Sequence, residues 1–137
     1  MTMSFFSMSY IDALAELYQA KTPFVQITLI ESRGSTPNDQ GAKALVTRSG
    51  LVWGTVGGGK VEAKALEQAA KMLDEKTTEN VKHFFVTWNL QKDVGMTCGG
   101  EVKLFFETHL LKSWTLAVFG AGHVAQKLVP ILSELEA

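Results

Sequence analysis

The sequence predicts an α/β fold in which helices pack on a mixed β-sheet. Two observations predict it: some segments repeat apolar residues at helical spacing, and others are short runs rich in β-branched and aromatic residues. A third observation, an apolar run that leads into a glycine-rich turn near the C-terminus, indicates the start of a second α/β unit. Because 137 residues leave little beyond one domain, we expect a first domain over residues 1–112 and an incomplete second unit over residues 113–137.

The first predicted elements are a helix and a strand. Apolar residues lie on one helical face of residues 9–20, and Ser9 is a weak capping signal at the start of that segment. Pro23 ends the helical pattern, and residues 24–30 are apolar and β-branched enough to form a largely buried strand. A loop is expected over residues 31–41.

The middle of the chain predicts a hairpin followed by the clearest helix. Residues 44–47 and 51–53 have the composition of short strands, joined by a turn at Ser49-Gly50. After a run of three glycines, an apolar stripe predicts a helix over residues 60–73. The stripe consists of Val61, Ala65, Leu66, Ala69, Met72 and Leu73.

The last part of the chain predicts three strands and a helix. Residues 81–88 and 102–106 are expected to be strands on either side of a loop that holds the single cysteine. After a polar break, residues 115–119 predict a strand and residues 122–135 a helix.

Composition excludes several classes of function. A net charge of −1, without clustered Lys and Arg, argues against nucleic-acid binding. No apolar run approaches the roughly 20 residues that cross a bilayer. One cysteine cannot form an intramolecular disulfide, and residues 1–8 lack the features of a signal peptide. We therefore expect a cytoplasmic protein that binds neither nucleic acid nor membranes.

The glycine run lies between a predicted strand and a predicted helix. Gly57, Gly58 and Gly59 can expose backbone N–H groups at a helix N-terminus, where the helix dipole favours an anion, and Lys60 adds a full charge. The spacing differs from that of the nucleotide-hydrolase phosphate loop. Gly58 is expected either to admit an anion or to hold a left-handed conformation. The alternative is that the glycines allow a tight turn and close packing.

The loop around Cys98 predicts an accessible thiol. Gly95, Gly99 and Gly100 surround it, and a thiolate in such a loop can bind a soft metal or accept sulfur. The alternative is a small buried apolar residue. Neither a zinc site nor a Cys-His dyad is indicated. Three acidic residues of the two glycine loops could act as acid or base but receive no assigned chemistry: Glu62, Asp93 and Glu101.

Four motifs follow one another along the chain. In order they are ESRGSTP at residues 31–37, GAKALV at 41–46, GTVGGGKVE at 54–62 and TCGGEV at 97–102. Their order and spacing resemble the XdhC/CoxI family of xanthine dehydrogenase accessory proteins, and the resemblance extends nearly to Phe119.

The resemblance implies a chaperone rather than an enzyme. Such a protein would bind the molybdenum cofactor (molybdopterin), a phosphorylated pterin dithiolene, and support its sulfuration. It would then insert the cofactor into a xanthine-dehydrogenase-type molybdenum enzyme, and a cysteine desulfurase is a candidate partner. Glycine N–H groups would hold the phosphate, with Arg33 or Lys60 as counter-charge, and Cys98 would be the metal ligand. The implied cofactor-binding residues are Arg33, Gly57, Gly58, Gly59, Lys60, Cys98, Gly99 and Gly100.

A dinucleotide-like motif stands near the C-terminus. Gly120, Gly122 and Ala125 follow an apolar run and open a helical pattern, as in the G-x-G-x-x-A fingerprint. The acidic residue expected about 20 positions later would fall beyond Ala137, so NAD(P) binding requires a complete C-terminal domain. Family members carry a Rossmann-like domain here, so the resemblance implies its first strand and helix.

The apolar helix of this unit predicts self-association. Without the rest of a sheet it must bury its apolar face elsewhere, so we expect a homo-oligomer in which residues 115–135 pack against a partner chain. Two alternatives to the chaperone hypothesis stay open. One is a fragment of an NAD(P)-dependent oxidoreductase, and the other is a non-catalytic interaction module whose glycines serve turns.

Overall fold

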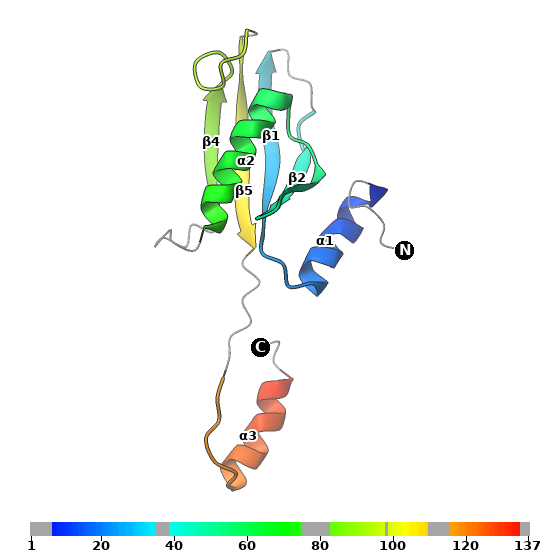
Figure 1. The fold of residues 1–137 in the computed structure, drawn as a ribbon, viewed down its shortest axis with the longest axis vertical. Helices are drawn as coiled ribbons and strands as arrows, with labels where there is room; N and C mark the ends of the chain where they lie inside the picture. The colour runs from blue at the N-terminus through cyan, green and yellow to red at the C-terminus, as the bar shows by residue number, and fades with distance from the viewer. Residues whose placement is uncertain (1–6, 35–38, 75–82, 98, 110–115, 135–137) are drawn as a thin grey trace.

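A computed structural model describes residues 7–34, 39–74, 83–97, 99–109 and 116–134 of the chain. It confirms the α/β class, with one five-stranded sheet and helix α2 lying across one face of it (Figure 1). In chain order the elements are α1 (Tyr10–Gln19), β1 (Phe24–Gly34), β2 (Lys43–Thr47), β3 (Gly50–Gly54), α2 (Gly59–Leu73), β4 (His83–Asn89), β5 (Gly100–His109) and α3 (His123–Ser133).

The sheet is antiparallel at every strand pair, not mixed as the sequence predicted. The strand order is β3-β2-β1-β5-β4, and each neighbouring pair is antiparallel. Helix α2 connects β3 to β4, which run in the same direction. A helical connection of this kind usually joins paired parallel strands. Here the two strands lie at opposite edges of the sheet and never pair.

The main core lies between α2 and the sheet. Helix α2 buries Val61, Ala65, Ala69 and Leu73 along its predicted stripe. These side chains pack with buried residues of β1, β2 and β5. Burying an aliphatic side chain such as Leu73 stabilises the fold by roughly 1.5–3 kcal/mol, so this packing fixes the helix on the sheet.

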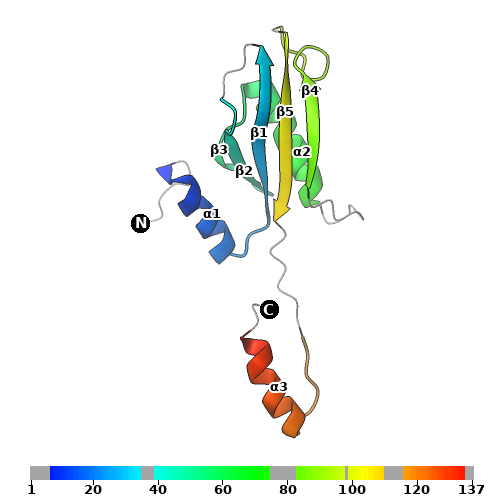
Figure 2. The same ribbon diagram turned by 180° about the vertical axis from the view of Figure 1, so that it is seen from behind.

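The other face of the sheet is only partly covered. Side chains alternate between faces along a strand, and Phe24 of β1 and Leu45 of β2 form a second core with Ala13 and Leu17 of α1. Helix α1 begins as predicted, because the Asp12 backbone N–H donates to the Ser9 hydroxyl oxygen at 3.2 Å. Seen from behind, β1, β5 and β4 carry no helix over most of this face (Figure 2).

Strand β1 is longer than predicted. Residues 31–34 were expected to be loop, but Arg33 and Gly34 pair with Glu101 and Gly100 of β5. A register shift between Leu29 and Glu31 lets the strand continue past Ile30. The hairpin of β2 and β3 forms as predicted.

The C-terminal unit differs from the prediction. Its helix is present as α3, but residues 116–120 form no strand, because a strand needs hydrogen-bonding partners and the described residues provide none. Thr115 and the predicted boundary after residue 112 lie outside the described residues. The Rossmann-like assignment therefore stays a prediction. Across the described ranges, no helix has the length and apolar character needed to span a membrane.

Candidate functional site

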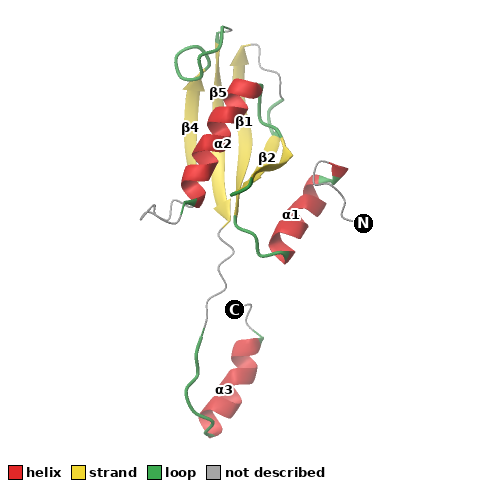
Figure 3. Ribbon diagram, in the orientation of Figure 1, coloured by secondary structure: helices red, strands yellow, loops and turns green. Residues whose placement is uncertain are grey.

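The two glycine loops lie together at one end of the sheet. The ammonium group of Lys60, in the first turn of α2, donates to the Gly95 carbonyl oxygen at 2.5 Å. One turn later, the Lys64 ammonium donates to the Asp93 carbonyl oxygen at 2.5 Å and lies 4.9 Å from the centre of the Trp88 ring. The start of α2 and the loop between β4 and β5 therefore form one surface. In Figure 3 the helix is red and the loop is green.

Arg33 stands at the same end of the sheet. It lies in β1 opposite Glu101 of β5, beside the point where the β4–β5 loop ends. Its side chain is 72% exposed, and its Nε donates to the Glu31 carboxylate at 2.8 Å. This bond and the nearby positive charge lower the pKa of Glu31. Arg33 is therefore a solvent-facing cation beside the cysteine loop.

The paired ends of β1 and β5 lie close together beside this loop. Gly34 has φ +91°, and a Cβ there would lie 2.8 Å from the Gly99 carbonyl oxygen. Gly100 has φ +149°, and a Cβ there would collide with the Arg33 carbonyl oxygen. Both conformations favour glycine, so the fold itself explains Gly100. Gly99 is different, because open space surrounds the position of its Cβ.

The three glycines of the first loop have different roles. A Cβ on Gly57 would lie 2.9 Å from Val61 Cγ1, so the packing of α2 explains this residue. Gly58 is the N-cap of α2 with φ −68°, so the left-handed conformation considered from the sequence is wrong. Gly59 has open space where a Cβ would stand. Neither backbone strain at Gly58 nor crowding at Gly59 accounts for the glycine run.

The N-terminal end of α2 offers backbone N–H donors. Gly58 has no side chain, so the first N–H groups of α2 have no side-chain acceptor at the cap residue. Together with the helix dipole, such donors favour an anion. Gly58, Gly59 and Lys60 therefore lie at a helix N-terminus, and the binding of an anion there stays a prediction.

The metal ligand proposed from the sequence cannot be placed. Cys98 lies outside the described residues, so its relation to Gly95 and Gly99 is a matter of sequence alone. Within the described ranges, no group of three His, Cys, Asp or Glu side chains could hold a metal ion.

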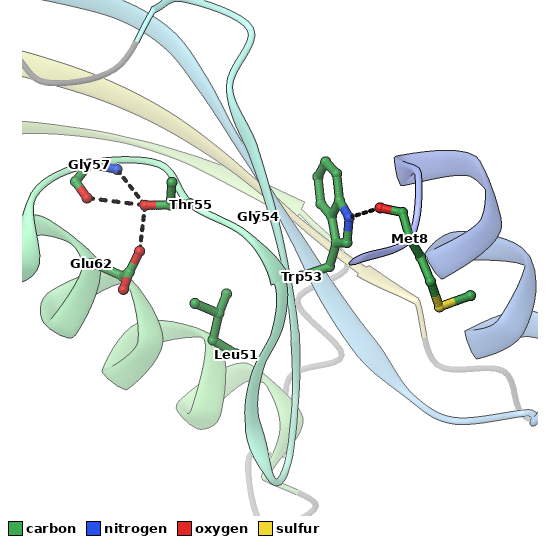
Figure 4. Close-up of a pocket in the computed structure, with 7 residues that line it drawn as sticks. All are labelled: Met8, Leu51, Trp53, Gly54, Thr55, Gly57 and Glu62. Carbon is green, nitrogen blue, oxygen red and sulfur yellow. Dashed lines mark hydrogen bonds between the residues drawn. The ribbon is translucent and has the colours of Figure 1, made fainter. Parts of the chain in front are cut away.

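An open hollow of about 620 Å³ begins at Gly57 and runs beside the edge strand β3 (Figure 4). Its polar wall is formed by Thr55 and Glu62. The Thr55 hydroxyl contacts both the Gly57 carbonyl oxygen, at 3.1 Å, and the Glu62 carboxylate, at 2.5 Å. Its other lining residues are Met8, Leu51, Trp53 and Gly54.

Sequence reasoning missed this hollow for a physical reason. Thr55 and Glu62 belong to the motif at residues 54–62, but no chemistry was assigned to Glu62 because a single carboxylate in a sequence is usually solvated. Met8 is distant in the chain and reaches the hollow because the Trp53 indole N–H donates to its carbonyl oxygen at 2.9 Å. Nothing in the sequence signals that contact.

The dinucleotide-like motif stands apart from this site. Gly120 has φ +108°, Gly122 is the N-cap of α3, and Ala125 lies in the first turn of that helix. The strand that should precede the motif is missing from the described residues, so the context for NAD(P) binding is incomplete. The oxidoreductase alternative has no support in this geometry.

Comparisons with known proteins agree on one group of relatives. Residues 17–84 match the XdhC and CoxI family. The chain is 36% identical to the uncharacterised protein YqeB of Escherichia coli K12 over 80% of its length. It is 30% identical to the molybdenum cofactor insertion chaperone PaoD of the same organism over 82% of its length.

A solved structure shares the fold. A Bacillus halodurans protein described as a xanthine dehydrogenase superposes on 74% of the chain with a TM-score of 0.58 and 25% identity. All these relatives are longer: the chain spans 20% of YqeB, 30% of PaoD and 30% of the Bacillus halodurans chain.

Proposed function

Residues 17–84 of this chain belong to the XdhC and CoxI family, and from that premise we propose that the chain binds the molybdenum cofactor as a chaperone. The further steps are part of the proposal: support of cofactor sulfuration, and insertion into a xanthine-dehydrogenase-type molybdenum enzyme. A cysteine desulfurase is the proposed sulfur donor. The likeness to PaoD, whose name describes cofactor insertion, supports the first step.

The observation that carries the proposal is the joining of the two glycine loops through Lys60 and Gly95. A cofactor with a phosphate at one end and a metal dithiolene at the other needs an anion site and a soft ligand close together. The bond brings the start of α2 beside the loop of Cys98, which is the one cysteine of the chain.

The residues at the start of α2 fit a phosphate. The N–H groups after Gly58 lack a side-chain cap, and Gly59 leaves the space of a Cβ open. Lys60 holds Gly95 with one of its N–H donors and has two more, and the exposed Arg33 stands at the same end of the sheet. These groups would hold the phosphate oxygens.

Cys98 is the proposed ligand of the metal end. A thiolate is a soft ligand suited to molybdenum and to sulfur exchange. When bound, the cofactor supplies the metal centre of the client enzyme's chemistry. The part of this chain is to hold it, shield it and release it.

The test is the cofactor content of the protein isolated from cells that make the cofactor. We expect molybdenum, phosphate and a pterin in equal amounts per chain, and a marked loss of molybdenum in Cys98→Ser. Met96→Leu is the matched control, because it removes a thioether from the same loop and should retain the metal. A wild-type protein without molybdenum and pterin would refute the proposal, and equal retention by Cys98→Ser would remove Cys98 from the site.

A further inference from the structure

We propose that the open hollow beside Glu62 binds the aminopyrimidinone edge of a pterin ring. This assigns one end of the ligand to the hollow that adjoins the first glycine loop. The inference rests on the proposed function for its choice of ligand, and on the hollow and its carboxylate for its position.

The position of Glu62 suits a ligand that presents two adjacent N–H donors. It lies in the first turn of α2, and the Thr55 hydroxyl contacts one of its oxygens, Oε2. The other carboxylate oxygen has no bonding partner in the part of the chain that the structure describes. An ionised carboxylate can accept about four hydrogen bonds, and Glu62 lines the hollow, so it retains capacity to accept bonds from a ligand there.

The chemistry of the wall selects the ligand edge. A pterin presents its 2-amino group and an adjacent ring nitrogen side by side, as an arginine presents its guanidinium fork. A carboxylate accepts such a pair with two parallel bonds. Leu51 and Trp53 also line the hollow and supply apolar surface, and pockets for small ligands combine apolar walls with a few polar groups in this way.

The size and position of the hollow agree with this ligand. Its volume of about 620 Å³ lies in the range of small-molecule sites. Gly57 lines the hollow and is the first residue of the glycine run, so the hollow adjoins the proposed phosphate site at the start of α2.

A purely structural role for Glu62 predicts something different. A carboxylate in the first turn of a helix interacts favourably with the helix dipole and needs no ligand. In that case Glu62 would affect stability and would not distinguish one heterocycle from another. Selectivity is therefore the property to measure.

The experiment compares pterin with lumazine, which carries a carbonyl oxygen where pterin carries the 2-amino group. Binding of each to the full chain is followed by ligand fluorescence anisotropy. We expect wild type to bind pterin at least about tenfold more tightly than lumazine, because lumazine loses a bond to a charged acceptor. Glu62→Gln should lose that preference. Glu67→Gln, which changes an exposed carboxylate bonded to Lys71 on the same helix, should keep it.

The outcomes separate this inference from the proposed function. Equal binding of pterin and lumazine by wild type would overturn the inference even if molybdenum copurifies with the chain. This result does not depend on whether the variants fold. A preference for pterin that survives in Glu62→Gln would overturn it as well. A preference that depends on Glu62 in a protein without bound molybdenum would support the pterin site while the chaperone proposal fails.

Discussion

Substitutions of two glycines in the first loop distinguish a role in folding from a role in binding. Gly57 is crowded by Val61, whereas Gly59 has open space around its Cβ position. We expect Gly57→Ala to lower the free energy of unfolding by about 1–3 kcal/mol, because Val61 is buried and β-branched and cannot easily move. Gly59→Ala should leave stability unchanged or raise it by up to about 1 kcal/mol, since alanine is the better helix former.

Urea unfolding of both variants, together with their bound phosphate, tests this difference. If Gly59 serves an anion, its alanine variant should fold normally and retain less phosphate. Equal destabilisation by the two substitutions would mean that the whole glycine run serves the fold.

The environment of His109 predicts that the stability of the fold depends on pH. Its ring stacks on Phe24 at 4.5 Å, its Nδ1 bonds to the Tyr18 hydroxyl at 2.9 Å, and its Nε2 is buried without a partner among the described residues. Burial lowers the pKa of His109, and the nearby Glu107 opposes this shift in part. The folded state therefore favours neutral His109.

A lowered pKa of a base predicts stability that is lost in acid. As pH falls below the unfolded value of about 6.5, the unfolded chain takes up a proton that the folded chain resists, so folding weakens. We expect the urea midpoint to fall between about pH 7.5 and about pH 5.5, and His109→Gln to reduce that fall. His83→Gln, at an exposed position, is the control. Glu31 and Glu67 have lowered pKa values and lose their contribution only below about pH 4.3, outside this window. An unchanged pH profile in His109→Gln would contradict the prediction.

At the scale of elements, the close pairing of β1 and β5 at Gly34 and Gly100 fixes the end of the β4–β5 loop. Gly100 combines φ +149° with a Cβ position blocked by the β1 backbone. We expect Gly100→Ala to destabilise the protein by about 1–3 kcal/mol, because the strands must separate or the backbone must change conformation. Gly99→Ala, one residue away with open space, should melt like wild type. Thermal unfolding of the two variants checks this. Equal melting temperatures would mean that the backbone around Gly100 adjusts to a side chain at no cost in stability.

Sequence predicted the elements better than their arrangement. The stripe of Val61, Ala65 and Leu73 was readable because helical periodicity is a local signal. The pairing of Arg33 with Glu101 was not, since it joins residues far apart in the chain, and the loop signal of Gly34 hid the end of β1. The antiparallel sheet was missed for the same reason, as the helix between β3 and β4 suggests parallel neighbours.

The candidate site was predicted in part. The two glycine loops were singled out from composition, and the structure places them side by side through Lys60 and Gly95. A glycine is needed for packing where a Cβ would collide with a neighbouring side chain, as a Cβ on Gly57 would collide with Val61. No sequence pattern carries that information. The hollow depends on the contact between Trp53 and Met8, which only the folded chain reveals.

At the scale of the whole molecule, the site and the C-terminal unit are separate. The start of α2, the β4–β5 loop and the end of β1 meet at one end of the sheet, so three remote segments build one surface (Figure 1). Helix α3 follows the opposite end of β5 and shares no residue with that surface. Changes in α3 should therefore leave ligand binding intact while they alter association.

Among the residues that the structure describes, none buries a side chain of helix α3. None of its residues is buried, and Val124 and Ile131 are 81% and 61% exposed. With 11 residues and Pro130 in its interior, it is too short and too interrupted to be stable in isolation. An apolar stripe on such a helix favours burial against another chain.

We therefore predict a homo-oligomer in which α3 packs against a partner chain. Sedimentation equilibrium of the full chain should show association, and Leu128→Glu with Ile131→Glu should abolish it by placing charges on the exposed stripe. A chain that ends at Lys112 should likewise be monomeric, and Lys127→Glu, which changes a charge without touching the stripe, should associate like wild type. A monomeric full chain, or a doubly substituted chain that associates just as tightly, would show that the stripe does not mediate self-association. Because α3 stands apart from the glycine loops, pterin binding by the doubly substituted chain should equal that of wild type, which separates loss of assembly from loss of the fold.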